Sequence, residues 1–255
     1  MSDTPGTNRA RTLPLALLQR YRPLIDDWAG FIDTMRRPLP ACVWTNPLRA
    51  RPEQLEPLLA ADGLEPTPIG WDPSGFRLRE SDRFGTRWWY LAGLCHAQEE
   101  VSRVPVALLE PQPGERILDL CAAPGGKTAQ IGIALLNRGT VVANDLTIDR
   151  MRPLRANLER LGLINISVTA HDGTAYPNAA GRFDRVLVDA PCSGEGTLRK
   201  RSTRHTPSGP EISRRFAERQ AALLKRAVAL CRPGGRIVYS TCTFAPEENE
   251  RVVDR

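Results

Sequence analysis

The stretch LDLCAAPGGKTAQIG, residues 118–132, combines an apolar strand, a turn of small residues and the start of a helix. It ends like a phosphate-binding P-loop, but such a loop needs a glycine five positions before Gly126, and Cys121 stands there. The dinucleotide fingerprint fails as well, because Gly125 and Gly126 are adjacent rather than spaced as GxGxxG. The stretch therefore predicts a ligand-binding turn between a strand and a helix, without naming the ligand.

Downstream of this turn, strand-like runs alternate with helix-like runs. Such alternation predicts parallel strands in a doubly wound sheet. The expected helices begin near residue 128 and cover 150–162 and 214–231, and the expected strands cover residues 116–120, 140–145, 166–172, 185–191 and 235–242. We therefore expect an α/β fold, with a mostly parallel Rossmann-like sheet in residues 106–255.

Upstream of the turn the sequence is less regular. A smaller module or lid is expected in residues 1–105, because the regular alternation of strand-like and helix-like runs begins only after about Pro111. Within it we expect a helix over Leu15–Met35, a strand over Ala41–Thr45, a second helix over Pro52–Ala61, and a stretch rich in proline, glycine and tryptophan up to Tyr90.

The composition favours a nucleic-acid partner and a reducing, cytoplasmic environment. The formal net charge of +6 suits a polyanion, although an arginine-rich chain can simply carry a solvated basic surface. The six cysteines form no CxxC pair and no zinc-like pairing with the three histidines, so no metal is expected. The apolar run Leu13–Leu18 is too short to span a membrane.

Four successive strands end in an acidic residue, at Asp119, Asp145, Asp172 and Asp189. Ligands of doubly wound sheets lie beyond these strand ends. Carboxylates would repel a phosphate but suit a cationic ligand with hydroxyl and amine donors. S-adenosylmethionine is such a ligand, and Asp145 stands where an acid commonly binds a ribose. The alternative is that each acid caps the next helix.

Two cysteines also follow strand ends. Cys192 lies in DAPCSGEG, residues 189–196, where an amine methyltransferase would have an aromatic residue, and Cys242 ends GGRIVYSTC. Carbon 5 of a pyrimidine attacks a sulfonium only after a thiolate has added at carbon 6. Because strands four and five should be neighbours, both sulfurs are expected to open into one crevice. The tract TLRKRSTRH, residues 197–205, could grip backbone phosphates or be a solvated face.

Taken together, LDLCAAPGGKT, DAPCSGEGTLRK and YSTCTFAPEENE closely resemble the Sun (nucleolar-protein-type) family of RNA cytosine-5 methyltransferases. TPIGWDPSGF and AGLCHAQEE, residues 67–76 and 92–100, look most like its bacterial ribosomal RNA branch. The resemblance implies a methyltransferase sheet preceded by a small α/β RNA-recognition-like module. It also implies an S-adenosylmethionine donor and RNA, ribosomal rather than transfer RNA, as the substrate of a monomer.

The resemblance also implies roles for single residues. Cys242 would be the nucleophile and Cys192 would help product release, while Asp189 would lie near the donor amine and the target base. Asp145 would bind the ribose and Asp172 the adenine. The other donor contacts would come from Cys121, Ala122, Ala123, Pro124, Gly125, Gly126, Lys127 and Arg150.

The chain departs from the family pattern in two places. Residues 43–46 read VWTN where the family often has Arg-Val-Asn, and no sequence follows for the two further edge strands, so we expect the C-terminal edge of the sheet to be missing. A non-catalytic RNA-binding relative, and a methyltransferase for a protein or small molecule, are the competing hypotheses.

Overall fold

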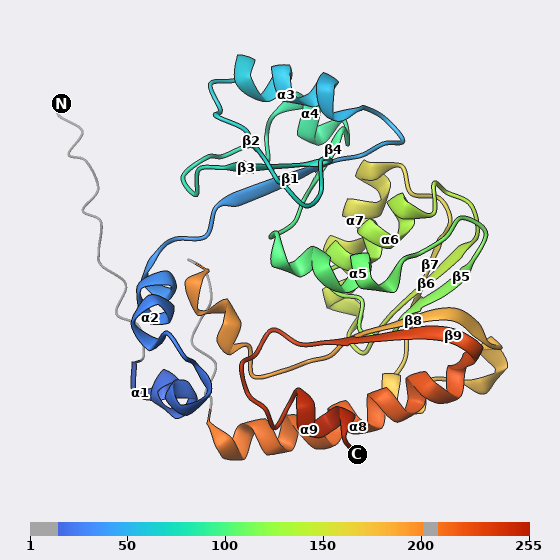
Figure 1. The fold of residues 1–255 in the computed structure, drawn as a ribbon. Helices are drawn as coiled ribbons and strands as arrows, with labels where there is room; N and C mark the ends of the chain where they lie inside the picture. Colours follow the sequence, from blue (N-terminus) through green and yellow to red (C-terminus); the bar gives the residue numbers. More distant parts are fainter. Residues whose placement is uncertain (1–14, 201–208) are drawn as a thin grey trace.

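The computed structural model describes residues 15–200 and 209–255 and contains two β-sheets (Figure 1). A four-stranded sheet in the order β2-β3-β1-β4 belongs to the N-terminal part of the chain, and a five-stranded sheet in the order β7-β6-β5-β8-β9 belongs to the rest. Within residues 15–200 and 209–255, no helix is both long enough and apolar enough to cross a membrane.

The expected single helix over Leu15–Met35 is wrong. The segment forms α1 (Leu15–Leu18), a 3-10 turn η1 (Gln19–Leu24) and α2 (Trp28–Arg36). Pro23 lies inside η1 and cannot donate a helical hydrogen bond. Asp27 then caps α2 by accepting the Gly30 N–H at 2.8 Å, so the chain starts a new helix instead of continuing the old one.

The N-terminal sheet is antiparallel and carries two helices. β1 (Ala41–Thr45) and α3 (Pro52–Ala61) match the expected bounds. The Pro/Gly/Trp-rich stretch contains elements that the sequence did not indicate, namely β2 (Thr67–Pro68), β3 (Gly75–Leu78), α4 (Trp88–Leu91) and β4 (Cys95–Ala97). Their core packs Val43 of β1 against Leu55 of α3 and the fully buried Trp89 of α4.

The five-stranded sheet is parallel throughout, which confirms the doubly wound α/β prediction. After η2 (Val101–Arg103) and α5 (Val104–Leu109), its strands are β5 (Arg116–Asp119), β6 (Thr140–Asp145), β7 (Ile166–Ala170), β8 (Phe183–Asp189) and β9 (Cys231–Ser240). The helices between and after them are α6 (Gly126–Ala134), α7 (Met151–Leu161), α8 (Pro210–Leu230) and α9 (Glu250–Val253).

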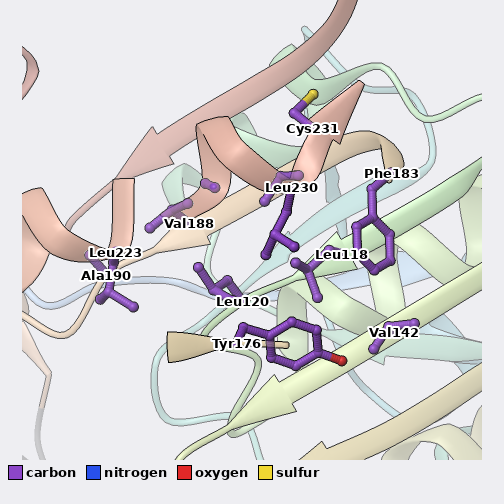
Figure 2. Close-up of a cluster of buried hydrophobic side chains, with 12 residues drawn as sticks. Leu118, Leu120, Val142, Tyr176, Phe183, Val188, Ala190, Leu223, Leu230 and Cys231 are labelled. Atoms are coloured by element: carbon purple, nitrogen blue, oxygen red, sulfur yellow. The ribbon is translucent and has the colours of Figure 1, made fainter. Parts of the chain in front are cut away.

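Both faces of this sheet are buried, as parallel strands require. On one face Ile117 and Val141 pack against α5 and α6. On the other face Leu118 and Phe183 pack against the α8 residues Leu223 and Leu230 (Figure 2). Short 3-10 turns η3 (Ile148–Arg150), η4 (Gly173–Ala175), η5 (Asn178–Ala180) and η6 (Glu195–Arg199) follow the carboxyl ends of the strands.

Candidate active site

The two cysteines that follow β8 and β9 meet at one point. These strands are parallel neighbours, with Asp189 opposite Ser240. Their loops bring the Sγ atoms of Cys192 and Cys242 to 3.1 Å, and the Cys242 N–H donates to Cys192 Sγ at 3.2 Å. The structure therefore brings the two sulfurs together, and of the two only Cys242 lines the adjoining hollow.

The surroundings make the two sulfurs chemically different. The hydrogen bond from the Cys192 thiol lowers the pKa of Cys242, with help from the charges of Lys200 and Lys127, although burial and Asp189 act against it. The same hydrogen bond and burial raise the pKa of Cys192. These opposite directions favour Cys242 over Cys192 as the sulfur that loses its proton first.

The Cys242 side of this pair opens into a hollow of about 410 Å³, a size typical of small-ligand sites. Asp189 and Lys127 line it and form an ion pair, with Nζ 2.7 Å from Oδ2, while Ser240 Oγ donates to Asp189 Oδ1 at 2.8 Å. Phe31 of α2 also lines this hollow. The N-terminal segment thus completes a hollow whose reactive groups come from the C-terminal half.

The turn of small residues between β5 and α6 is held by packing and backbone geometry. Gly125 has a φ of +103°, and a Cβ there would lie 2.9 Å from Leu154 of α7. Only glycine satisfies both conditions. The Ala123 N–H donates to Asp145 Oδ2 at 3.0 Å, so the acid at the end of β6 fixes the turn that follows β5.

Asp145 and Arg150 lie together at this turn. The Asp145 carboxylate is only 3 % exposed and accepts from Arg150 Nη1 at 3.2 Å. Arg150 Nη2 also donates to the Ala123 carbonyl at 2.9 Å. These predicted donor residues are therefore neighbours, but in this structure the carboxylate already bonds to the protein itself.

The other two strand-end acids behave differently from each other. Asp172 accepts the Thr174 N–H at 3.0 Å, which lowers its pKa, and its side chain remains half exposed near Arg219. Its present contacts are those of a helix cap. Asp119 is sealed beneath the turn, where it accepts from Thr128 Oγ1 at 2.7 Å and burial raises its pKa to about 7.

A buried polar network supports the two cysteine loops, and sequence reasoning missed it. The Tyr21 hydroxyl donates to Glu195, and each residue is 2 % exposed. Nearby, the fully buried Glu248 accepts the Ser193 N–H at 3.0 Å. The only available signal was the presence of both glutamates inside the long motifs around the cysteines. Their partners are too distant in sequence to predict from spacing.

The basic tract after Cys192 is described only as far as Lys200; its residues 201–205 lie outside the described residues. Arg199 Nε donates to the Arg37 carbonyl at 3.0 Å, which ties η6 to the end of α2. Arg199 and Lys200 both line the hollow that contains Cys242. The described part of the tract is therefore a wall of the site.

Comparisons with known proteins match both parts of the chain. Residues 106–255 match the family model of the 16S rRNA methyltransferases RsmB/F, and residues 13–100 match that of the N-terminal domain of 16S rRNA methyltransferase RsmF. The chain is 40 % identical over 246 residues to a mouse 28S rRNA (cytosine-C(5))-methyltransferase, covering 94 % of this chain and 31 % of that protein.

A bacterial relative and a solved structure agree with these matches. Ribosomal RNA small subunit methyltransferase F of Klebsiella pneumoniae is 38 % identical over 247 residues, with 94 % of this chain and 52 % of that protein covered. A crystal structure of a methyltransferase homolog from Pyrococcus horikoshii superposes with a TM-score of 0.78 at 31 % identity, covering 93 % of this chain and 80 % of that one. The chain spans about half, or less, of the length of these curated relatives.

Proposed function

Since the chain belongs to the RsmB/F family of 16S rRNA methyltransferases, we propose that it methylates carbon 5 of a cytosine in RNA. The favoured substrate is ribosomal RNA, with transfer RNA as the alternative, and the favoured donor is S-adenosylmethionine. The observation that carries the proposal is the pair of sulfurs 3.1 Å apart, of which only Cys242 has a lowered pKa. Methylation of an exocyclic amine or a hydroxyl would need neither sulfur.

The residues present fit a cationic methyl donor. Carboxylates stand at or just after the carboxyl ends of β6, β7 and β8, at Asp145, Asp172 and Asp189, and such groups suit a ligand that carries a sulfonium, an ammonium and a ribose diol. When bound, S-adenosylmethionine supplies an electrophilic methyl group. The turn Ala122–Lys127, with Cys121 before it, would hold its methionine part, Asp145 with Arg150 its ribose, and Asp172 its adenine.

The reaction begins with the sulfur of Cys242. Its thiolate forms a bond to carbon 6 of the cytosine, which makes carbon 5 nucleophilic enough to take the methyl group. Asp189 lies in the same hollow, where its carboxylate can accept a hydrogen bond from the exocyclic amine of the base. Its contacts with Lys127 Nζ and Ser240 Oγ hold the carboxylate in position in this hollow.

The second half of the reaction releases the product. Loss of the carbon-5 proton to solvent re-forms the aromatic ring and breaks the bond between carbon 6 and the Cys242 sulfur. The Cys192 thiol lies 3.1 Å from that sulfur and stabilises the departing thiolate by donating a hydrogen bond. This release step comes after the methyl group has moved, in addition to the effect of Cys192 on the pKa of Cys242 before addition.

The two parts of the chain would have different functions. Residues 106–255 would form the methyltransferase domain and residues 1–105 the RNA-binding module, whose α2 already lines the catalytic hollow through Phe31. The hollow is assembled within a single chain, which supports action as a monomer. A ribosomal RNA substrate supports a cytoplasmic location.

The test exploits the order of the two cysteines. Each single alanine variant is incubated with donor and with ribosomal RNA from cells that lack the gene, and the mixture is run on a denaturing gel. Cys242→Ala should give neither methylation nor adduct. Cys192→Ala should accumulate a methylated RNA covalently attached to the protein. Bisulfite sequencing of the RNA treated with the parent protein identifies the cytosine.

Three other outcomes would change the proposal. An adduct in Cys242→Ala that is absent in Cys192→Ala would reverse the two roles. Donor binding by calorimetry without transfer to any RNA would leave a non-catalytic RNA-binding relative. Tritium transfer from the donor to protein or metabolites alone would assign the chain to another substrate class.

A further inference from the structure

A second hollow of about 420 Å³ adjoins the catalytic one. The two hollows share four lining residues, namely Leu39, Glu99, Arg199 and Lys200. Leu39 comes from the connection between α2 and β1, and Glu99 from the connection between β4 and η2. The two spaces are therefore neighbours, separated only by these side chains.

The inner surface of the second hollow is apolar. Ala41 and Cys42 at the start of β1 and Ala97 at the end of β4 line it. Cys42 is only 5 % exposed, and burial raises its pKa to about 11, so its thiol remains neutral. Such a surface suits the flat face or edge of an uncharged ring and offers nothing to a phosphate.

An aromatic ring and a cation stand on the outer side. Phe84 is half-buried, and its ring is held by Trp89 and Tyr90 at centroid distances of 6.2 and 5.5 Å. The neighbouring Arg83 is exposed and donates to the carbonyls of Glu80, Ser81 and Asp82, and it makes no ion pair within the described part of the chain. An aromatic surface beside a basic side chain is the arrangement that binds single-stranded nucleic acid.

Two carboxylates, of Glu80 and Glu99, also line this hollow. The Glu99 carboxylate is oriented by Ser102, whose Oγ donates to it at 2.8 Å. Carboxylates would repel a phosphate but accept hydrogen bonds from an amine on a base edge. Arg83, Arg199 and Lys200 line the same hollow, so a nucleotide can place its base against the apolar surface and its phosphate near these cations.

We propose that this hollow binds the base of a nucleotide adjacent to the target cytosine. The proposal rests on the proposed function, because it assumes that a cytosine occupies the catalytic hollow. Proteins that read single-stranded RNA splay bases apart and stack them on aromatic side chains. The target base would enter beside Cys242 while its neighbour stacks against Phe84. The Glu99 carboxylate would favour a neighbour that carries amine donors over uracil.

The experiment removes single bases from the substrate. Ribosomal RNAs carrying the unmodified target cytosine are assembled by ligation with a single abasic nucleotide at one flanking position at a time, and kcat/KM is measured for the full chain. One abasic position should lower kcat/KM by roughly 5- to 150-fold, the range for loss of one base–aromatic stack. In Phe84→Ala the intact RNA should react as slowly as the abasic one does with the parent, and the abasic lesion should add less than about threefold.

Two further variants guard against a folding artefact. Arg83→Gln changes an exposed side chain and should flatten the salt dependence of RNA binding by about one unit of slope. Trp88→Ala removes another aromatic ring of the same module, 60 % exposed and outside both hollows, and should keep the full abasic effect. Donor binding by calorimetry verifies that each variant is folded.

The possible outcomes distinguish a failure of the subsite from a failure of the proposed function. If the parent methylates the intact RNA but no flanking abasic site changes kcat/KM by as much as twofold, the subsite is wrong and the proposed function stands. An abasic effect that persists unchanged in Phe84→Ala also overturns the subsite. If the parent methylates no RNA, the proposed function fails and the subsite fails with it.

Discussion

Replacing Tyr21 by phenylalanine should destabilise the protein in a way that depends on pH. Tyr21→Phe removes one oxygen and leaves the ring in its contact with Phe244, where the centroids are 5.9 Å apart. What is lost is the hydrogen bond to Glu195, which joins the N-terminal segment to the loop after Cys192. Both residues are buried, so water does not replace the missing donor.

The size of the effect follows from the charge of Glu195. A hydrogen bond to a charged group contributes roughly 1.5–3 kcal/mol. Glu195 keeps a weaker contact from Thr243 Oγ1 at 3.4 Å, which places the expected loss near the middle of that range, at about 2 kcal/mol. Removing the constraint on the catalytic loop should also lower kcat while leaving donor affinity unchanged.

The pH dependence has a definite sign. Burial raises the pKa of Glu195, and the Tyr21 hydroxyl opposes that rise by stabilising the charged form. Tyr21→Phe therefore raises the pKa of Glu195 further in the folded state. This lowers the free energy of unfolding at pH values above the pKa that Glu195 has in the folded parent protein. Below the unfolded-state pKa the carboxyl is neutral in both proteins, and only a neutral hydrogen bond of about 1 kcal/mol is lost.

Urea unfolding of parent and variant from pH 4 to pH 8 measures this difference. The matched control is Tyr176→Phe, because Tyr176 is 3 % exposed but its hydroxyl has only a long contact of 3.4 Å with Thr169 Oγ1. The control should cost less than the test variant at neutral pH and show no comparable pH trend. A Tyr21→Phe deficit below about 0.5 kcal/mol at pH 7, or one that is constant with pH, would refute the reasoning.

Three further changes test the site itself. Asp145→Ala removes the carboxylate that holds the donor turn, so calorimetry should show donor affinity at least about tenfold lower; parent-like affinity would contradict its placement. Cys192→Ala removes the hydrogen bond that lowers the pKa of Cys242, so the pH midpoint for alkylating Cys242 should rise, and an unchanged midpoint would show that another group sets it. Gly125→Ala places a Cβ on a left-handed backbone and 2.9 Å from Leu154, so thermal unfolding should show a lower free energy of unfolding. A decrease of less than about 1 kcal/mol would mean that the turn relaxes.

The parts that sequence could predict are those encoded locally. Alternating strands and helices identified the parallel sheet, and two cysteines after consecutive strands were expected to meet once those strands were neighbours. The short strands β2, β3 and β4 were not indicated, because two to four residues in a proline- and glycine-rich stretch leave no period to detect.

The missed parts depend on contacts between distant residues. Nothing near Tyr21 indicates that its partner is Glu195, 174 positions away. Asp119 and Asp145 occupy the same place in the local pattern, yet one is sealed under Thr128 and the other holds the Ala123 amide. Local sequence reasoning likewise did not rank the two cysteines, which only the family resemblance did, because the pKa of each sulfur depends on its hydrogen bond with the other.

The contacts of the N-terminal segment with residues distant in the sequence affect how the protein folds during its synthesis. Arg20 and Tyr21 leave the ribosome early, but their partners Glu247 and Glu195 are 227 and 174 positions further along. A contact of such separation cannot form until the later residues have emerged, and distant contacts form slowly. We therefore expect the four-stranded sheet of the nascent chain to form before α1 and α2 pack against the rest of the protein. Phe31 of α2 packs against Phe244, which follows β9, so the wall that α2 contributes would close, and the hollow around Cys242 would be complete, only after β9 has emerged.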